Sequence, residues 1–421
     1  MQLTYKEKFE LLFEISHKVR DTLDLDEIME HILDTIHTVV EYDAAGIFVL
    51  NQDLVHGRRE HPKEMIAGIA RRGFDEKSPE EDAMLTEGKG VIGYVIASAS
   101  SLIVPDVSRE PHYVEGRSRT RSEIAVPIIR NKRAIGALNL ESDRPATYDE
   151  SHLVVLQFFA DAAAISIEKA MLHRQLLEKE LLDKQLELAR DLQRRLFPGE
   201  PPRLAGYDIA GICLPAEEIG GDYFDFIPLP RRGLGIAVAD VSGHGIASAL
   251  VMTAFRGLLR IHACGSRGLE KIAYTLNRQL PEFTGNRHFV TAVYAVLNPA
   301  TGSFTHVCCG HPRPLLIHSD GRVESLEEHG PVLGMLDDVT YPTVEVSLVP
   351  GDIMVLYTDG VVELNDQTSY YFGVNGLVSA ILQNLDLSAI ELIQLIIHAT
   401  HQFSGRQSYA DDFTLVVIKR T

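Results

Sequence analysis

The pattern of apolar and polar positions divides the chain into a mixed N-terminal part, a long helical stretch and a strand-rich C-terminal part. In the first part, residues 5–40 show helical periodicity, with apolar residues from Leu25 to Val39 recurring at spacings of three and four. The run 91–96 is apolar throughout and fits either a helix or a strand. Strands flanked by helices predict a small α/β domain. The strands are predicted over 44–50, 65–70, 102–104, 124–128 and 134–140, the last two forming a hairpin around Asn131-Lys132.

The middle of the chain predicts one long helix. Neither glycine nor proline occurs from Ala146 to Phe197, and strong helix formers fill the stretch up to Pro198. A continuous helix of about 50 residues would measure about 75 Å, more than a domain of this size needs internally. We favour a parallel coiled-coil dimer over a single helix that packs on its own two domains, although the heptads are imperfect. The expected seam consists of Leu182, Leu186, Ala189, Gln193 and Leu196, widened by Leu172, Leu176, Leu177, Leu181 and Leu188.

The C-terminal part mixes apolar runs typical of strands with amphipathic helices. Strands and helices do not alternate strictly, so we expect an α/β (α+β) two-sheet sandwich and not a parallel βαβ sheet. Strands are predicted over 235–238, 289–297, 303–308, 315–318, 353–357 and 413–418. Helices are predicted over 246–263, 268–280, 376–382 and 387–402.

Composition narrows the function classes. A length of 421 residues suits two or three domains, and a hydrophobic fraction of 45% supplies a core for each. The formal net charge of -19 argues against a nucleic-acid or anionic-membrane binder, which needs a basic face. The four cysteines have neither disulfide-framework nor zinc-site spacing, and no run of about 18 apolar residues predicts a membrane span. With no signal peptide evident at the N-terminus, we expect reduced thiols and a cytoplasmic protein.

Four acidic motifs in the C-terminal part carry the most chemistry. Their aspartates stand beside glycines and mostly adjoin predicted strands, so the fold is expected to gather the carboxylates at strand ends. Hard dications such as Mg²⁺ and Mn²⁺ prefer oxygen ligands of this kind, and two such ions can activate water for attack on a phosphoryl group. The motifs are Gly220-Gly221-Asp222-Tyr223-Phe224-Asp225, Asp240-Val241-Ser242-Gly243-His244-Gly245, Tyr357-Thr358-Asp359-Gly360 and Asp411-Asp412-Phe413-Thr414.

With these motifs in this order, the C-terminal 220 or so residues resemble the PPM-type serine/threonine phosphatases, specifically their bacterial SpoIIE/RsbU-like branch. The resemblance implies an αββα two-sheet sandwich, a site for two Mn²⁺ or Mg²⁺ ions, and hydrolysis of phosphoserine or phosphothreonine on a protein. Further matching pieces are Ala189–Pro198, Phe289–Val293, Gly310-His311-Pro312 and Pro350-Gly351-Asp352.

The resemblance also assigns roles to individual residues. Asp240 is expected to bridge both ions, joined by the Val241 carbonyl. Asp222 is expected to support one ion, while Asp359 and Asp411 hold the other. Asp412 is either a further ligand or a support for the ligands, ranked below Asp411. We take the catalytic group to be Asp222, Asp240, Asp359 and Asp411.

Three other polar residues near the motifs receive weaker assignments. His244 invites the role of general acid, but Ser242 occupies the place where the wider family has a proton-donating histidine, so we favour a loop histidine. His311 is interpreted as orienting a loop, and Asp225 as pairing with backbone or supporting Asp222. No phosphate-binding arginine is apparent near the first acidic motif.

The N-terminal part resembles a GAF sensor domain over about residues 10–170. The pattern indicates the fold but not the ligand. No cysteine lies in this region, which excludes a thioether-linked bilin, and Glu141-Ser142 occupy the place of an Asn-Lys pair typical of cyclic-nucleotide sites. We interpret the segment with His112, Tyr113 and the arginines 117, 119 and 121 as a solvated loop in preference to an anion site. The resemblance rests on Gly90–Val95, Ile103–Val107, Ile124–Ile128, Ile135–Leu140 and Tyr148-Asp149-Glu150.

These expectations define a signal-regulated phosphatase. A GAF domain (1–150) reads an unknown small-molecule or protein signal, a linker helix (151–198) joins two chains in a homodimer, and a phosphatase domain (199–421) acts on a phosphoprotein. The resemblance suggests an anti-sigma-factor antagonist as substrate. The alternative is a scaffold with a weak or inactive phosphatase fold that acts by binding. Neither nucleic acid nor membrane is an expected partner.

Overall fold

The computed structural model describes residues 25–50, 66–74, 88–230, 232–265, 267–285, 287–366 and 370–421. The chain forms two compact units, divided between Leu181 and Leu182. Helix α5 (Glu150–Arg194) begins in the first unit and ends in the second. The predicted helical periodicity over 5–24 lies outside the described residues.

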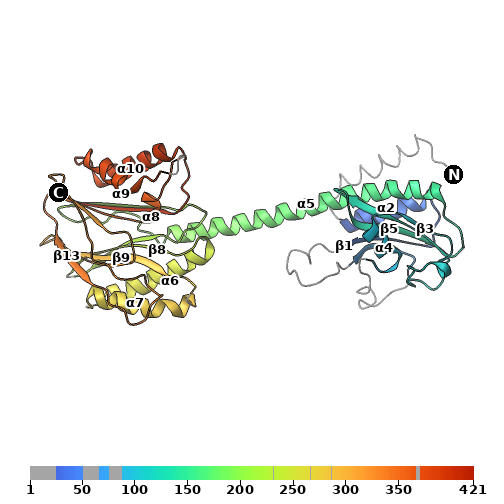
Figure 1. Ribbon diagram of the computed structural model, residues 1–421, viewed down its shortest axis with the longest axis horizontal. Coiled ribbons are helices and arrows are strands. Elements are labelled where there is room, and N and C mark those ends of the chain that lie inside the picture. Colours follow the sequence, from blue (N-terminus) through green and yellow to red (C-terminus); the bar gives the residue numbers. More distant parts are fainter. Residues whose placement is uncertain are drawn as a thin grey trace. The chain divides into compact units, whose positions relative to one another are not determined.

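The N-terminal unit is a five-stranded antiparallel sheet with helices on both faces (Figure 1). Helix α2 (Leu25–His37) and the first turns of α5 pack on one face, where Phe159 is fully buried. Helix α4 (Gly90–Ser98) covers the other face, so the ambiguous run 91–96 is a helix. The strand order is β2 (Ile66–Arg72), β1 (Ala44–Leu50), β5 (Arg133–Ser142), β4 (Ser122–Arg130) and β3 (Leu102–Val104).

The hairpin between β4 and β5 turns at the predicted residues. Asn131 and Lys132 have φ angles of 49° and 66°. Two successive positive φ angles match the twist of a tight antiparallel hairpin, and asparagine tolerates them well. The hairpin matters for function because it fixes which residues of β4 and β5 share each face of the sheet.

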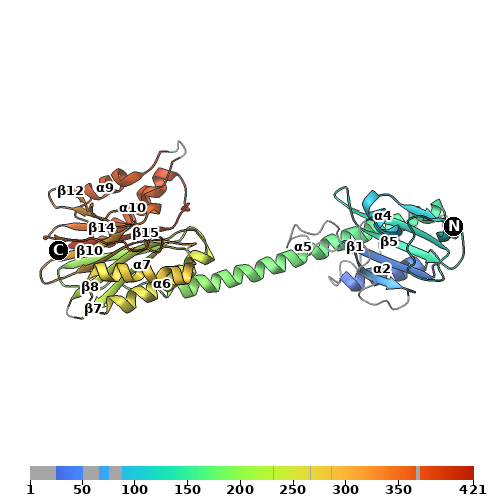
Figure 2. The ribbon, with the colours of Figure 1, turned by 60° about the horizontal axis from the view of Figure 1, so that its bottom comes forward.

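The C-terminal unit is a sandwich of two five-stranded sheets with helices outside each sheet (Figures 1 and 2). Helices α6 (Ile246–Ala263) and α7 (Leu269–Thr284) cover the first sheet. Helices α8 (Asp359–Val362), α9 (Gly373–Leu382) and α10 (Ala389–Ser404) lie against the second. The first sheet runs β13 (Thr343–Ser347), β10 (Ser303–Cys309), β9 (Val290–Leu297), β8 (Gly233–Val241), β7 (Tyr223–Leu229). The second runs β12 (Val323–Ser325), β11 (Leu315–Ile317), β14 (Ile353–Tyr357), β15 (Phe413–Arg420), β6 (Tyr207–Leu214).

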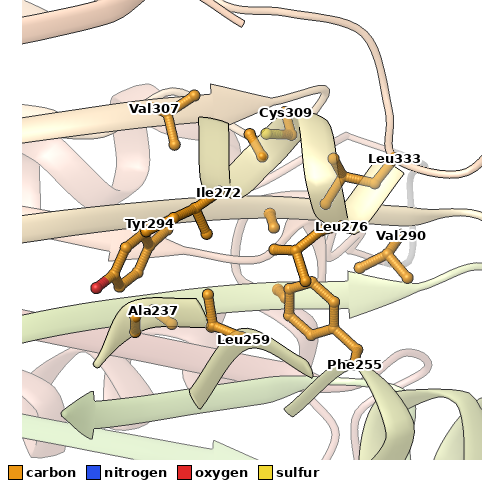
Figure 3. Close-up of a cluster of buried hydrophobic side chains, with 14 of the residues drawn as sticks. Ala237, Phe255, Leu259, Ile272, Leu276, Val290, Tyr294, Val307, Cys309 and Leu333 are labelled. Atoms are coloured by element: carbon orange, nitrogen blue, oxygen red, sulfur yellow. The ribbon is translucent and has the colours of Figure 1, made fainter. Parts of the chain in front are cut away.

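Apolar side chains fill three interfaces between these four layers. Figure 3 shows the interface between α6, α7 and the first sheet, where Phe255 and Leu276 point toward Tyr294 and its neighbours. A second cluster lies between the sheets and a third under α9 and α10. Strands buried on both faces explain the near-continuous apolar runs in the sequence. The predicted αββα class is therefore confirmed.

One described helix, α6, is long and apolar enough to cross a membrane by length and composition. Its buried residues, among them Met252 and Phe255, pack onto the first sheet. This packing accounts for its apolar character within the folded unit.

Candidate functional site

The acidic motifs lie where strands begin or end. Asp222 directly precedes β7, and Asp240 is the second-last residue of β8. These strands pair antiparallel with Tyr223 opposite Ala239, so the two aspartates share one end of the first sheet. In the second sheet, Asp359 follows the end of β14 and the pair 411–412 precedes β15. Those two strands are also antiparallel neighbours, so their acidic residues share one end too.

Hydrogen bonds join the two acidic ends across the sandwich. The Thr358 hydroxyl donates to Oδ2 of Asp222 at 2.8 Å. Oδ2 of Asp412 accepts the Gly221 backbone N–H at 2.7 Å, and Oδ1 accepts that of Ala216 at 2.8 Å. The segment that carries Asp222 is thus held directly by residues that flank β14 and β15 of the second sheet.

Glycines permit this close approach. A methyl group on Gly220 would overlap the Asp412 carboxylate, and one on Gly360 would overlap the Asp412 carbonyl oxygen. A methyl group on Gly221 would lie 2.8 Å from the Val241 carbonyl oxygen. These three glycines are required because the backbone passes within contact distance of the acidic residues.

The carboxylates are electrostatically coupled. Burial and then Asp240 raise the pKa of Asp222 well above its usual value. Burial, followed by Asp359, Asp411 and Asp412, raises the pKa of Asp240 to about 7. Burial and then Asp411 raise the pKa of Asp359. The carboxylates therefore repel one another, and among the described residues none of the groups responsible for these shifts is basic.

This uncompensated, all-oxygen cluster has the chemistry of a Mg²⁺ or Mn²⁺ site, because added positive charge would relieve the repulsion. In the arrangement described, no group of three or more His, Cys, Asp or Glu side chains is placed to hold a metal ion. The carboxylate of Asp412 is bonded to backbone N–H groups and that of Asp222 to Thr358. The donor set fits the ions.

The remaining polar residues of the motifs have distinct surroundings. Asp225 is fully buried, accepts two hydrogen bonds from Arg260 at 2.6 and 2.8 Å and one from the Tyr223 hydroxyl, and does not contact Asp222 in any described bond. The His244 side chain is 88% exposed beside Glu217. His311 is buried, with Nδ1 2.7 Å from the Thr291 hydroxyl, and burial lowers its pKa to about 3.

The end of α5 contributes a contact that the sequence did not predict. Gln193 Nε2 donates to the Gly220 carbonyl at 2.7 Å, and the Gly220 N–H donates to Gln193 Oε1 at 3.3 Å. Arg190 Nε donates to the Glu218 carbonyl at 2.8 Å. Gln193 was expected in the coiled-coil seam, but its amide is committed to the acidic segment, and Leu196 packs against the first-sheet core. Gln193 lies within Ala189–Pro198, one of the pieces on which the phosphatase resemblance rests, and this was the sequence signal for its contact with the acidic segment.

A small cleft opens beside Asp411. It has a volume of about 160 Å³, and its wall includes Glu363, Asn365 and Arg406. Arg406 is the basic residue of this wall, and Tyr371 also lines the cleft. The cleft therefore offers polar and aromatic groups next to the acidic cluster.

Comparisons with known proteins find a family match within each of the two units. Residues 230–421 match the family model described as Stage II sporulation protein E (SpoIIE), and residues 22–168 match the GAF domain model. The chain thus combines a PPM-type serine/threonine phosphatase domain of the SpoIIE kind with an N-terminal GAF domain.

Individual relatives are similar over part of the chain. Phosphoserine phosphatase RsbU of Bacillus subtilis is 29% identical over 242 residues, which are 57% of this chain and 71% of RsbU. Phosphoserine phosphatase RsbP of the same organism is 29% identical over 184 residues, 43% of this chain and 45% of RsbP. Protein IcfG of Synechocystis is 25% identical and matched over 41% of its length. The solved SiaA-PP2C domain of Pseudomonas aeruginosa shares the fold, with a TM-score of 0.50 at 20% identity over 57% of this chain and 98% of that domain.

Proposed function

We propose that this protein removes phosphate from phosphoserine or phosphothreonine of a partner protein in a reaction that depends on two Mn²⁺ or Mg²⁺ ions. The observation that carries the proposal is the coupled, uncompensated carboxylate cluster at the joined ends of the two sheets. The similarity to two phosphoserine phosphatases supports the same reaction. The formal net charge of -19 fits a protein substrate better than nucleic acid or an anionic membrane.

Each carboxylate of the cluster has its own proposed role in binding the two metal ions. Asp240, with the Val241 carbonyl, would bridge the two ions, Asp222 would support one, and Asp359 and Asp411 would hold the other. When bound, the ions supply a water of lowered pKa and neutralise charge on the phosphoryl oxygens. Asp412 positions the Asp222 segment through its backbone hydrogen bonds. His244 is left exposed beside Glu217, which fits a surface role better than proton transfer.

The substrate is proposed to be a small phosphoprotein of the anti-sigma-factor antagonist kind. The cleft beside Asp411 would take the residues that flank the phosphorylated side chain, with Arg406 available to an acidic group of the substrate. Because the cleft is small, most of the specificity must come from protein surface outside it.

Phosphate release from a phosphoserine peptide tests this function. We expect turnover with Mn²⁺ or Mg²⁺, none with EDTA, and little turnover of the matched phosphotyrosine peptide. Metal-independent turnover would contradict the mechanism. Binding of a phosphoprotein without turnover at any metal concentration would favour the scaffold alternative.

Regulation is proposed to act on the assembly of the metal site. The last turns of α5 hold the acidic segment through two side chains. Gln193 bonds Gly220 and Arg190 bonds the Glu218 carbonyl, two and four residues before Asp222. The same helix begins in the unit that matches the GAF domain. A shift or rotation of α5 would therefore move the segment that carries Asp222. In this scheme residues 1–150 sense the signal, 151–198 transmit it and 199–421 respond.

Removing the Gln193 amide tests this coupling. We expect Gln193→Ala to raise the Mn²⁺ concentration for half-maximal activity about tenfold, because two hydrogen bonds to Gly220 are lost. The control is Gln185→Ala, an exposed glutamine on the same helix. Equal metal dependence in both variants and the wild type would show that α5 does not act through Gln193.

The exposed part of α5 is proposed to form a homodimer. Leu177, Leu181 and Leu188 are more than half exposed and follow one another at spacings of four and seven, which suits a coiled-coil seam. This seam lies N-terminal to Gln193, so one helix would serve both contacts. A second copy of the chain is the simplest partner for an apolar line of this length.

Charge placed in this line should prevent association. We expect the double variant Leu181→Glu, Leu188→Glu to be a monomer at micromolar concentration in sedimentation, where the wild type is a dimer. Gln175→Glu, an exposed change on the same helix, should leave the dimer intact. A wild-type monomer at this concentration would contradict the dimer.

A further inference from the structure

The cleft beside Asp411 contains an arginine whose side chain has no partner among the described residues. Arg406 is exposed, and its described hydrogen bonds are made by its backbone atoms with the Ser404 hydroxyl. Glu363 and Asp411 line the same cleft, but neither forms an ion pair with Arg406 in the part of the chain that the structure describes. The planar set of N–H donors on the guanidinium is therefore available to a ligand.

The backbone that carries Arg406 is fixed by the end of α10. Gly405 caps this helix in the left-handed region, with a φ angle of 65°, and its N–H donates to the His401 carbonyl at 2.9 Å. The Arg406 N–H donates to the Ser404 hydroxyl at 3.3 Å. A capped end of a packed helix positions a side chain more precisely than a free loop does.

The room in the cleft suits a phosphorylated side chain. Its volume of about 160 Å³ is the share of about five water molecules in the liquid. Asp411 and Arg406 both belong to its wall, so a group in the cleft would meet the proposed metal site and the guanidinium together. Among the described residues, no other basic side chain lines the cleft.

Charge balance favours a contact between Arg406 and the phosphate. Two dications would offset the four carboxylates proposed to hold them, while Glu363 on the cleft wall would keep its charge. A phosphoserine brings about two further negative charges into this acidic surrounding. An arginine is well suited to compensate them, because its fork of N–H donors matches two phosphate oxygens at once.

We propose that Arg406 binds the phosphate group of the substrate in the part of the cleft beside Asp411. The residues that flank the phosphorylated side chain occupy the rest of the cleft. Arg406 thus supplies the phosphate-binding arginine that is not apparent near the first acidic motif, from a helix end far along the sequence. This inference rests on the proposed function, because it takes its ligand from that reaction.

Binding of a phosphopeptide that cannot be hydrolysed tests this contact separately from turnover. The probe is a labelled peptide in which a phosphonate, with a methylene group in place of the ester oxygen, replaces phosphoserine. The control is the same peptide with serine, and fluorescence anisotropy with the full-length protein in Mn²⁺ measures binding. We expect Arg406→Ala to weaken binding of the phosphonate peptide about 10- to 100-fold, the size of charge-assisted hydrogen bonds, and to leave binding of the serine peptide unchanged.

Further variants separate charge from shape and from folding. Arg406→Lys keeps the charge but loses the planar fork, so we expect an affinity between those of the wild type and Arg406→Ala. Arg322→Ala removes another exposed arginine of the same unit, one paired with Asp320, and should bind the phosphonate peptide as the wild type does. Arg406→Ala should unfold at the wild-type temperature, because its side chain loses no described partner.

The possible outcomes distinguish this contact from the proposed function. Arg406→Ala that binds the phosphonate peptide within about threefold of the wild type, or that loses the serine peptide to the same extent, would overturn the contact. Normal release of phosphate together with either result would leave the function in place. Binding that depends on Arg406, without release of phosphate from the phosphoserine peptide, would support the contact and contradict the function. A wild type that does not bind the phosphonate peptide at about 1 mM would contradict both.

Discussion

Replacing Asp240 with asparagine is expected to lower kcat/KM for phosphoserine hydrolysis about 1000-fold, the range seen when a group central to charge stabilisation is lost. Asp240 stands at the centre of the coupled cluster, since Asp359, Asp411 and Asp412 all act on its pKa. Asparagine keeps the size of the side chain but cannot supply the negative charge that a pair of dications requires. Steady-state kinetics at saturating Mn²⁺ measures the change.

The matched control is Asp320→Asn, which changes an exposed aspartate of the same unit paired with Arg322. Its kcat/KM should equal that of the wild type. If Asp240→Asn retained activity within about threefold, the assignment of Asp240 as the shared ligand would be wrong.

The second large effect is expected on the stability of the fold, when Asp225 is replaced. Asp225→Ala is expected to lower the free energy of unfolding by about 3 kcal/mol, because it leaves the Arg260 guanidinium and the buried Tyr223 hydroxyl without their acceptor. The estimate takes the lower end of the range because the Arg260 side chain is 40% exposed. Urea unfolding of the C-terminal unit, without added metal, measures it.

Asp222→Ala, three positions earlier, provides the contrast. Its carboxylate is buried among like charges, so its loss should leave the metal-free protein as stable as the wild type or more so, while activity is lost. Equal destabilisation by the two substitutions would contradict the division between a structural Asp225 and a functional Asp222.

Sequence patterns predicted most of the architecture because buried strands and long helices leave strong signals. The α6 bounds 246–263 and the β14 bounds 353–357 were predicted to the residue. Strands β6, β7, β12 and β13 of the C-terminal unit were missed. Strand β7 contains Asp225 and Pro228, β12 has three residues, all exposed, and β13 alternates between exposed and half-buried positions. Helix α5 ends at Arg194, ahead of Pro198, because its last residues turn to contact the phosphatase fold.

The acidic motifs could be predicted from the sequence, but the hydrogen bonds that join them could not. Nothing local in the sequence shows that the Asp412 carboxylate binds the backbone of Gly221, 191 positions away. The position of Gln193 fits the heptad pattern of a coiled-coil seam. Only the tertiary structure shows that its amide makes two hydrogen bonds with the Gly220 backbone. In the N-terminal unit, Glu123 and Glu141 became a pair once the β4–β5 register was known.

The central claim is that the acidic cluster becomes a two-ion centre that performs the phosphatase reaction. The most direct measurement is a Mn²⁺ titration of the full-length protein at pH 8, with metal binding measured by calorimetry and phosphate release measured in the same samples. At this pH the Asp240 carboxyl, whose pKa is about 7, has lost its proton and can bind metal. We predict two ions bound per chain and turnover that rises with their occupancy. Turnover that is already complete without metal, or two bound ions with no release of phosphate from phosphoserine, would contradict the account.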